Sequence, residues 1–164
     1  MDKSGVKWSL LAKWQSGEGV LMLLGTHTPK LDEKGRVILP AKFREAFGSG
    51  LVITRGQDDC LLVFSAAEFK NRADAISQAP LTNQAARNYI RVFMSGAHAE
   101  TPDKQGRVTV PSVLREYASL TRELVVIGVG NHAEIWDAKT WNEFLSKQED
   151  PYSNIAEEVI PGII

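Results

Sequence analysis

The chain has 164 residues, 43% of them hydrophobic and 24% charged, which is the composition of a soluble globular protein with one ordinary domain or two small ones. Its 19 basic and 20 acidic residues give a net charge of −1, so nucleic-acid binding would need a local cluster of cations. A single cysteine, Cys60, excludes an internal disulfide, and no stretch reaches the roughly 18 apolar residues that span a bilayer, so we predict a cytoplasmic protein without membrane contact.

One motif is written twice in the chain. "LDEKGRVILPAKFRE" begins at Leu31, and "PDKQGRVTVPSVLRE" begins at Pro102. With an offset of 71 between Asp32 and Asp103 (103 − 32), seven of the fourteen positions that start at Asp32 are identical. Unrelated segments would share about one. The sequence therefore contains an internal duplication, which has to be recognised before its elements are assigned.

Each repeat predicts the same first elements in chain order. A lead-in strand, "GTHTPKLD" or "GAHAETPD", is followed by an Asp-x-x-Gly turn in which Gly35 or Gly106 supplies a positive φ. A second strand, "RVILP" or "RVTVP", completes a hairpin. Its proline then begins a short helix, "AKFREAFG" or "SVLREYASL".

The second half of each repeat predicts another hairpin and another helix. The strands are "LVITRG" with "CLLVF" in the first repeat, and "LVVIGVG" with "AEIWD" in the second. Ser65 and Asp137 are suitable N-caps for the helices that follow. The predicted fold class is therefore α+β, mostly β, with the element order ββαββα written twice.

Two further segments lie outside the repeats. Residues 66–95 predict a helical insert that is broken at Pro80 and carries a core-facing apolar stripe on its second helix. The stripe consists of Ala86, Ile90, Phe93 and Met94. Residues 146–164 are acidic, contain two prolines and show no helical period, so we predict a flexible acidic tail.

These residues resemble a known family. The two "Dx(K/Q)GRVxxP" blocks, each with "RE" four residues after the proline and the first preceded by "GTHTP", are similar to the MraZ family of bacterial transcriptional regulators. The resemblance implies two SpoVT/AbrB-like swapped-hairpin β-barrel repeats that form an internal pseudo-dimer, and chains that assemble into rings. It also implies a nucleoid-associated regulator, usually a repressor, that binds short tandem repeats of double-stranded DNA upstream of its own gene, which heads the division and cell-wall gene cluster.

The resemblance also sets the domain boundaries. It implies an extra segment at 1–21, SpoVT/AbrB-like domains at 22–70 and 96–145, a helical insert at 71–95 and the tail at 146–164. Family members are expected to begin near Met22. Gly17-Glu18-Gly19 would be coded by a purine-rich run suited to a ribosome-binding site, so we expect that the start codon of this chain is mis-set.

The motif predicts a DNA-binding hairpin tip in each repeat. Cations at such a tip give affinity through phosphate contacts, and an arginine that bonds guanine O6 and N7 gives specificity. The aspartates are expected to accept backbone N–H groups, since a carboxylate facing a phosphate would repel it. The predicted DNA-binding residues are Lys30, Lys34, Arg36, Lys104 and Arg107, and the predicted turn-anchoring residues are Asp32, Gly35, Asp103 and Gly106.

Alternatives stay open for these residues. On the motif alone, each arginine could form a surface ion pair with the aspartate of its own turn and contribute little. The second tip is less basic, because Gln105 stands where the first has Lys34, and is expected to contribute less to binding. The "RE" pairs, Arg44-Glu45 and Arg115-Glu116, are assigned to packing or subunit contacts.

Other chemistries lack the residues they need. His27 and His98 match across the repeats, but no Cys or His lies at metal-ligand spacing from them, so no metal site is predicted. Asp32 and Asp103 each precede an arginine, so neither pKa is expected to rise toward neutrality as acid–base catalysis would need. No P-loop, nucleophile elbow or dinucleotide motif is present. We therefore expect no enzyme, no cofactor and no small-molecule substrate.

Two other functions compete with a DNA-binding regulator. An AbrB-like antitoxin would have one β-domain and a long toxin-binding tail, whereas here the domain is duplicated and the tail is short. A ring-forming structural protein would not need cations at both turns. Because one hairpin with a few cations binds DNA weakly, we expect a homo-oligomer that engages operator boxes about 10 bp apart.

Overall fold

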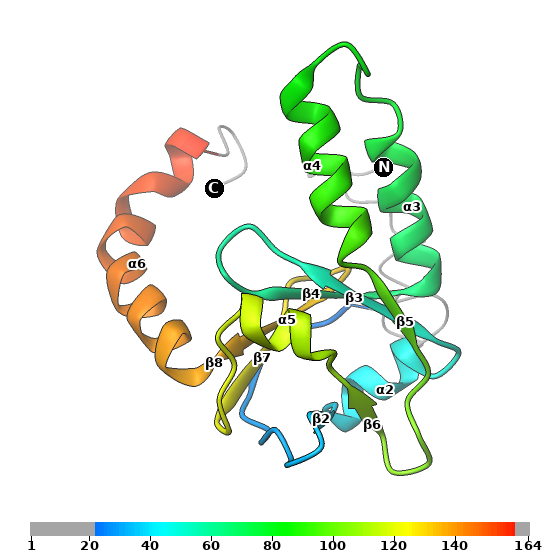
Figure 1. The fold of residues 1–164 in the computed structure, drawn as a ribbon. Coiled ribbons are helices and arrows are strands. Elements are labelled where there is room, and N and C mark those ends of the chain that lie inside the picture. Colours follow the sequence, from blue (N-terminus) through cyan, green and yellow to red (C-terminus); the bar gives the residue numbers. More distant parts are fainter. Residues whose placement is uncertain (1–21, 160–164) are drawn as a thin grey trace, which may run out of the picture.

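The computed structural model describes residues 22–159, whose arrangement is shown in Figure 1. The expected extra segment 1–21 and residues 160–164 lie outside the described residues. In chain order the elements are β1 (Thr26–His27), β2 (Arg36–Ile38), α2 (Ala41–Phe47), β3 (Leu51–Arg55), β4 (Leu61–Ser65), α3 (Ala66–Ile76), α4 (Gln84–Ser95), β5 (His98–Glu100), β6 (Arg107–Thr109), α5 (Ser112–Tyr117), β7 (Leu124–Gly128), β8 (Ala133–Asp137) and α6 (Ala138–Val159).

The order of these elements confirms the predicted fold class. The first repeat runs from β1 to α3 and the second from β5 to α6, each in the order ββαββα, with α4 between them. Ser65 begins α3 by accepting a hydrogen bond from the Glu68 N–H at 3.2 Å. Asp137, the other predicted cap, accepts one from the Lys139 N–H at 3.3 Å at the start of α6.

The strands of the two repeats interleave in one antiparallel sheet. Its order within the described residues is β1-β7-β8-β4-β3-β5. Each lead-in strand lies on the hairpin of the other repeat, because β1 pairs with β7 and β5 pairs with β3. The two hairpins join where β4 pairs with β8. This exchange is the internal pseudo-dimer that the resemblance implied, and it leaves neither repeat with a complete sheet of its own.

The sheet is open and is not closed into the expected β-barrel. After the Asp32 turn, β2 leaves the large sheet and pairs with β6 in a separate two-stranded ribbon, so the expected hairpin of each lead-in with its own second strand does not form. The pairing partners give the physical reason. β1 and β5 pair with strands of the other repeat in the large sheet, whereas Val37 of β2 and Val108 of β6 pair with each other and are buried.

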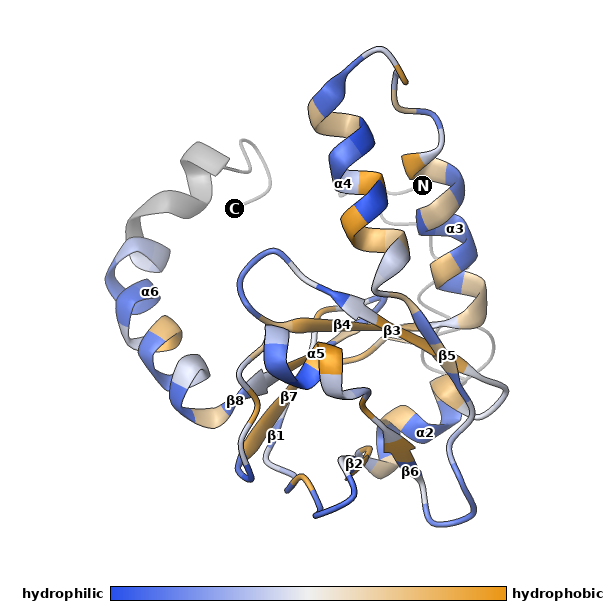
Figure 2. Cartoon of the chain, in the orientation of Figure 1, coloured by the Kyte–Doolittle hydropathy of each residue, from blue (hydrophilic) through white to orange (hydrophobic). Residues whose placement is uncertain are grey.

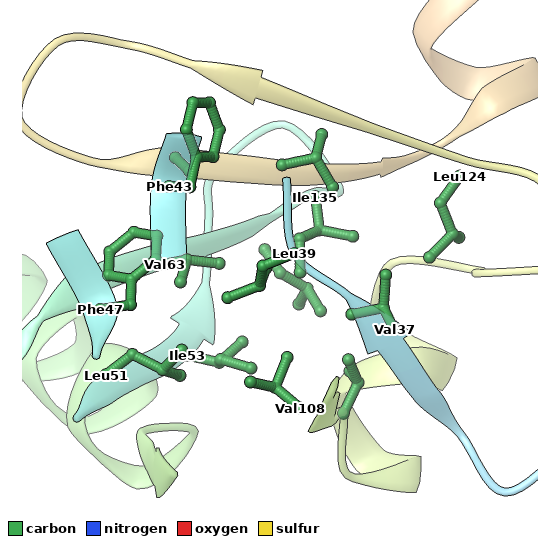
Figure 3. Close-up of a cluster of buried hydrophobic side chains, with 14 of the residues drawn as sticks. Val37, Leu39, Phe43, Phe47, Leu51, Ile53, Val63, Val108, Leu124 and Ile135 are labelled. Atoms are coloured by element: carbon green, nitrogen blue, oxygen red, sulfur yellow. The ribbon is translucent and has the colours of Figure 1, made fainter. Parts of the chain in front are cut away.

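The ribbon covers the core of the large sheet. Val37 and Val108 pair in its centre, and each is only 1% exposed. Figure 3 shows both in one cluster with side chains of the large sheet and α2. That cluster includes Leu39, Phe43, Phe47, Leu51, Ile53, Val63, Leu124 and Ile135. Burying one aliphatic side chain contributes about 1.5–3 kcal/mol, so this shared core holds the repeats and the ribbon together.

The helical insert stands on the large sheet (Figure 1). The Asn83 side chain caps α4 by accepting a hydrogen bond from the Ala86 N–H at 3.1 Å. Phe93 of the predicted stripe is buried, and its carbonyl oxygen accepts a hydrogen bond from the Thr54 hydroxyl of β3 at 2.6 Å. Met94 is exposed, so its predicted place in the core is wrong. It follows Phe93 by one residue, which turns it about 100° away on a helix.

The C-terminal helix is longer than predicted. Trp141 and Phe144 of α6 pack on Trp136 with ring centroids 5.3 and 5.0 Å away. The helix then continues through Pro151 to Val159, so the prediction of an irregular tail is wrong for residues 146–159. Pro151 removes one backbone N–H, whereas the Lys, Gln, Glu and Ala residues around it favour helix.

Leu39 and Ile38 are neighbours with opposite environments, at 0% and 48% exposure. Leu39→Ala should lower the free energy of unfolding by about 2–5 kcal/mol, because it leaves a cavity in the shared core. Ile38→Ala should change it by no more than about 1 kcal/mol. Urea denaturation followed by circular dichroism measures both, and equal losses would contradict this placement of the core.

Candidate nucleic-acid interface

The ribbon of β2 and β6 brings both copies of the duplicated motif together. Its facing pairs are Arg36 with Thr109, Val37 with Val108, and Ile38 with Arg107. Figure 1 shows the turns before β2 and β6 at the same end of the molecule, away from α3 and α4. Both turns are hydrophilic in Figure 2, whereas the strands of the sheet behind them are largely hydrophobic. Motifs far apart in the sequence therefore share one polar surface.

Asp32 organises the first turn. Its Oδ1 accepts hydrogen bonds from the N–H groups of Lys34 and Arg36, both at 2.9 Å. Its backbone accepts one from the Gly35 N–H at 3.0 Å and donates one to the Arg36 carbonyl at 2.8 Å. Gly35 has a φ of 75°, a conformation that glycine adopts without a steric cost. This is the geometry that a turn-anchoring role requires.

The second turn repeats the first. The Asp103 Oδ1 accepts hydrogen bonds from the N–H groups of Gln105 and Arg107, both at 2.9 Å. The Gly106 N–H donates to the Asp103 carbonyl at 2.9 Å, and Gly106 has a φ of 78°. The two halves of the motif therefore form equivalent structures, although Gln105 replaces the lysine of the first tip.

Both aspartates are held in the ionised form. The backbone hydrogen bond from Arg36, assisted by bonds from its side chain and from the Lys34 N–H, keeps the pKa of Asp32 below its ordinary value of 3.8. The corresponding backbone bond from Arg107 lowers the pKa of Asp103. Hydrogen bonds donated to a carboxylate favour its charged form. Each negative charge is thus matched by the arginine of its own turn.

The motif arginines bond these carboxylates through Nε. The Nε–Oδ2 distance is 2.8 Å from Arg36 to Asp32 and 2.7 Å from Arg107 to Asp103. The arginine side chains are 26% and 31% exposed. Within residues 22–159, no protein acceptor bonds the η nitrogens of either arginine. The ion pair that the motif left as an alternative is present, but it fixes each guanidinium group and leaves the η donors available.

The predicted lysines have different surroundings. The Lys30 Nζ lies 3.9 Å from the Glu123 carboxylate of the second repeat, a surface ion pair that contributes little. Lys34 and Lys104 are exposed, and neither forms an ion pair within the described part of the chain. The structure therefore brings all five predicted cations to the ribbon end of the molecule, with Lys30 already paired.

Arg44 and Arg115, which the sequence assigns to packing or subunit contacts, pack against the turns within the chain. A Cβ atom on Gly35 would lie 2.8 Å from the Arg115 Cζ, and one on Gly106 would lie 2.7 Å from the Arg44 Cζ. The Nε groups of Arg44 and Arg115 donate to the carbonyl oxygens that follow β2 and β6, at 3.1 and 3.0 Å. Each arginine thus packs on the turn of the other repeat. Its signal in the sequence was the "RE" pair at the same distance after both prolines.

His27, His98 and Cys60 have surroundings that are typical of structural roles. The His27 ring meets Phe43 edge-on at 5.0 Å, and the His98 Nε2 lies 2.8 Å from the Glu100 carboxylate. Burial raises the pKa of the Cys60 thiol to about 12, so it stays protonated. Within residues 22–159, no group of three or more His, Cys, Asp or Glu is placed to hold a metal ion. No helix in that range is long and apolar enough to cross a membrane.

The low pKa of Asp32 makes its contribution to stability depend on pH. The contribution is present above pH 3.8 and is lost as the pH falls through the lowered pKa of the folded state. Asp32→Asn should therefore lower Tm at neutral pH by a few degrees, and the two proteins should converge in acid below pH 3.8. Thermal melts followed by circular dichroism measure this. A difference that stays constant into acid would contradict the ionic role of Asp32.

Comparison with known proteins identifies the family. Residues 22–92 and 93–161 each match the model of one family, described as "MraZ protein, putative antitoxin-like". The relative in Leifsonia xyli subsp. xyli is 63% identical over 142 residues, which cover 87% of this chain and 99% of that protein. The relative in Paenarthrobacter aurescens is 58% identical over 143 residues, covering 87% and 100%.

A third relative, in Kineococcus radiotolerans, is 55% identical over 143 residues, again covering 87% of this chain and 100% of the relative. All three carry the name "Transcriptional regulator MraZ". The family match covers both repeats and begins at Met22, where the resemblance of the motif also began. With both repeats matched and full-length relatives above half identity, this chain belongs to the MraZ family.

Proposed function

We propose that this protein is a sequence-specific DNA-binding regulator of transcription and that the β2–β6 ribbon is the part that enters the DNA. The relatives that cover both repeats are named transcriptional regulators. The observation that carries the proposal is a single ribbon whose outward face carries two arginines, one from each repeat, held by aspartates with their η donors unpaired.

The ribbon has the dimensions and donors for direct readout. The major groove of B-DNA is about 12 Å wide and admits a two-stranded ribbon. Arg36 and Arg107 lie on opposite sides of the central valine pair, so they can contact bases at two positions along the groove. An arginine can donate two hydrogen bonds to guanine O6 and N7. Because the aspartates already fix the guanidinium groups, little side-chain entropy is lost on binding.

The lysines supply affinity that does not depend on sequence. Lys34 and Lys104 are exposed at the turns, where they can contact phosphates beside the groove. Lys30 would exchange Glu123 for a phosphate at small cost, since an exposed ion pair is weak. The first repeat carries more of this charge and so contributes more to non-specific binding.

A single ribbon cannot bind DNA tightly, because the chain has a net charge of −1 and a few cations give weak, salt-sensitive binding. We therefore extend the proposal to a ring of copies that presents several ribbons to tandem operator boxes. The operator would lie upstream of the protein's own gene, at the head of the division and cell-wall cluster. Binding would repress transcription on the nucleoid, in the cytoplasm.

Exposed apolar side chains away from the ribbon support assembly. On α4, Tyr89 and Val92 line an open groove of about 550 Å³ and are exposed. On α6, Leu145 and Tyr152 line a second hollow and are also exposed. Apolar surface of this kind favours contacts between copies.

Arg36→Ala should cost about 1–3 kcal/mol of binding free energy per engaged ribbon and relax the preference for the operator sequence, because it removes a base contact. Arg107→Ala should act in the same way. Lys34→Ala should weaken binding to all sequences alike and lower the salt slope by about one unit per lost phosphate contact. Fluorescence anisotropy with the DNA upstream of the gene measures all three.

The matched control is Lys70→Ala, which removes one exposed cation from α3, away from the ribbon. It should bind as the wild type does. Wild-type affinity and sequence preference in Arg36→Ala would refute the assignment of the ribbon to DNA.

Assembly and binding should depend on each other. The wild type should have a mass in light scattering that is a multiple of 18.1 kDa, and it should bind an array of boxes far more tightly than one box. Tyr152→Glu should lower that mass and bring affinity for the array toward that for one box. A wild-type monomer with equal affinity for one box and for several would contradict the ring.

A further inference from the structure

The outward face of the ribbon consists of four side chains. Strand alternation turns Val37 and Val108 into the core, where they are buried, and Val37 is seen in Figure 3. The opposite face therefore carries two facing pairs, Arg36 with Thr109 and Arg107 with Ile38. Side chains directly opposite each other on one face have Cβ atoms about 4.5–5.5 Å apart. Each motif arginine thus has one uncharged neighbour across the ribbon.

These two neighbours differ, although the repeats place them at equivalent positions (38 + 71 = 109). Thr109 presents a methyl and a hydroxyl group, whereas Ile38 is purely apolar and 48% exposed. The core does not need Ile38, because Val37 and Leu39 on either side of it fill the buried positions. Threonine would suit an exposed strand position equally well. Ile38 is therefore an exposed apolar side chain beside both motif arginines, opposite Arg107 and two residues from Arg36 on β2, where it is available for a contact outside the chain.

The surroundings of Ile38 restrict what that contact can be. It lines an open hollow together with two cations, Lys30 and Arg44, and with His27, Pro29, Leu39, Pro40 and Ala41. Among the groups on base edges in the major groove, the C5 methyl of thymine is the apolar one. Facing side chains on the ribbon are about 4.5–5.5 Å apart and successive bases on one strand about 3.4 Å, so the side chain opposite an arginine can reach a base next to the one that the arginine contacts.

We propose that Ile38 reads a thymine methyl next to the guanine bonded by Arg107, and that it makes the two halves of the ribbon differ in specificity. The inference rests on the proposed function and deepens it. On the other side of the ribbon, the hydroxyl and methyl of Thr109 accept either a polar or an apolar base edge beside Arg36. The operator half read by Arg107 and Ile38 is thus the half that requires a thymine.

Deoxyuridine in place of thymine tests this contact, because it keeps the base pair and removes only the C5 methyl. The probe is the operator array with one thymine position replaced in every box, each position in turn, measured by fluorescence anisotropy. For the wild type, one position should lose about four-fold in affinity per engaged box, the equivalent of one buried methyl group. Ile38→Ala should bind normal DNA more weakly by a similar factor and lose all sensitivity at that position.

Thr109→Ala is the matched control, since it truncates the equivalent side chain of the other repeat. It should keep the wild-type sensitivity at the position that Ile38 reads. Equal binding of the wild type to every deoxyuridine array, or full sensitivity retained in Ile38→Ala, would overturn the inference while leaving the DNA-binding function intact. A lower mass of Ile38→Ala in light scattering would also overturn it, because Ile38 would then be a contact between copies. Absence of any DNA binding by the wild type would overturn both proposals.

Discussion

The geometry of the candidate site depends on the antiparallel pairing of β2 with β6. Each strand has 3 residues and could not stay ordered alone, but Val37 and Val108 meet in the centre of the pair and are buried against the large sheet. Because side chains alternate along a strand, packing of the valines fixes the direction of their neighbours. The hydrophobic core thereby sets the outward position of Arg36 and Arg107 on one surface.

Exchange between the repeats makes that surface a single unit. Each lead-in strand lies on the other repeat's hairpin, and Arg44 and Arg115 each pack on the other repeat's turn. A chain with one repeat would lack one strand of the ribbon. It would also lack the hairpin on which its lead-in strand lies and the arginine that packs on its turn. Duplication therefore gives two guanidinium groups a fixed spacing, which two independently mobile hairpins would not have. A fixed spacing is what simultaneous readout of two places in one groove needs.

Much of the fold could be predicted from the sequence because the duplication presents each element twice. The order ββαββα, the glycines of both turns and the cap at Ser65 all follow from local patterns. The partner of β2 could not be predicted, because alternation shows which residue faces inward but not which strand lies alongside. The length of α6 could not be predicted, because Pro151 is typical of a helix end, whereas the helix-forming residues around it continue the helix to Val159. At the candidate site, the motif predicts the turn residues and the "RE" pairs predict packing. The partners of Arg44, Arg115 and Lys30 lie in the other repeat, so no local pattern could predict them.

The most direct test of two arginines reading guanines from one ribbon is methylation interference at guanine N7 on the operator array. Measured in low salt at protein concentrations that saturate each variant, methylation of two guanines in each box should block binding of the wild type, since arginine donates to N7. Arg36→Ala should lose the interference at one of these guanines, and Arg107→Ala should lose it at the other. The same interference pattern in the wild type and in both variants would contradict the account.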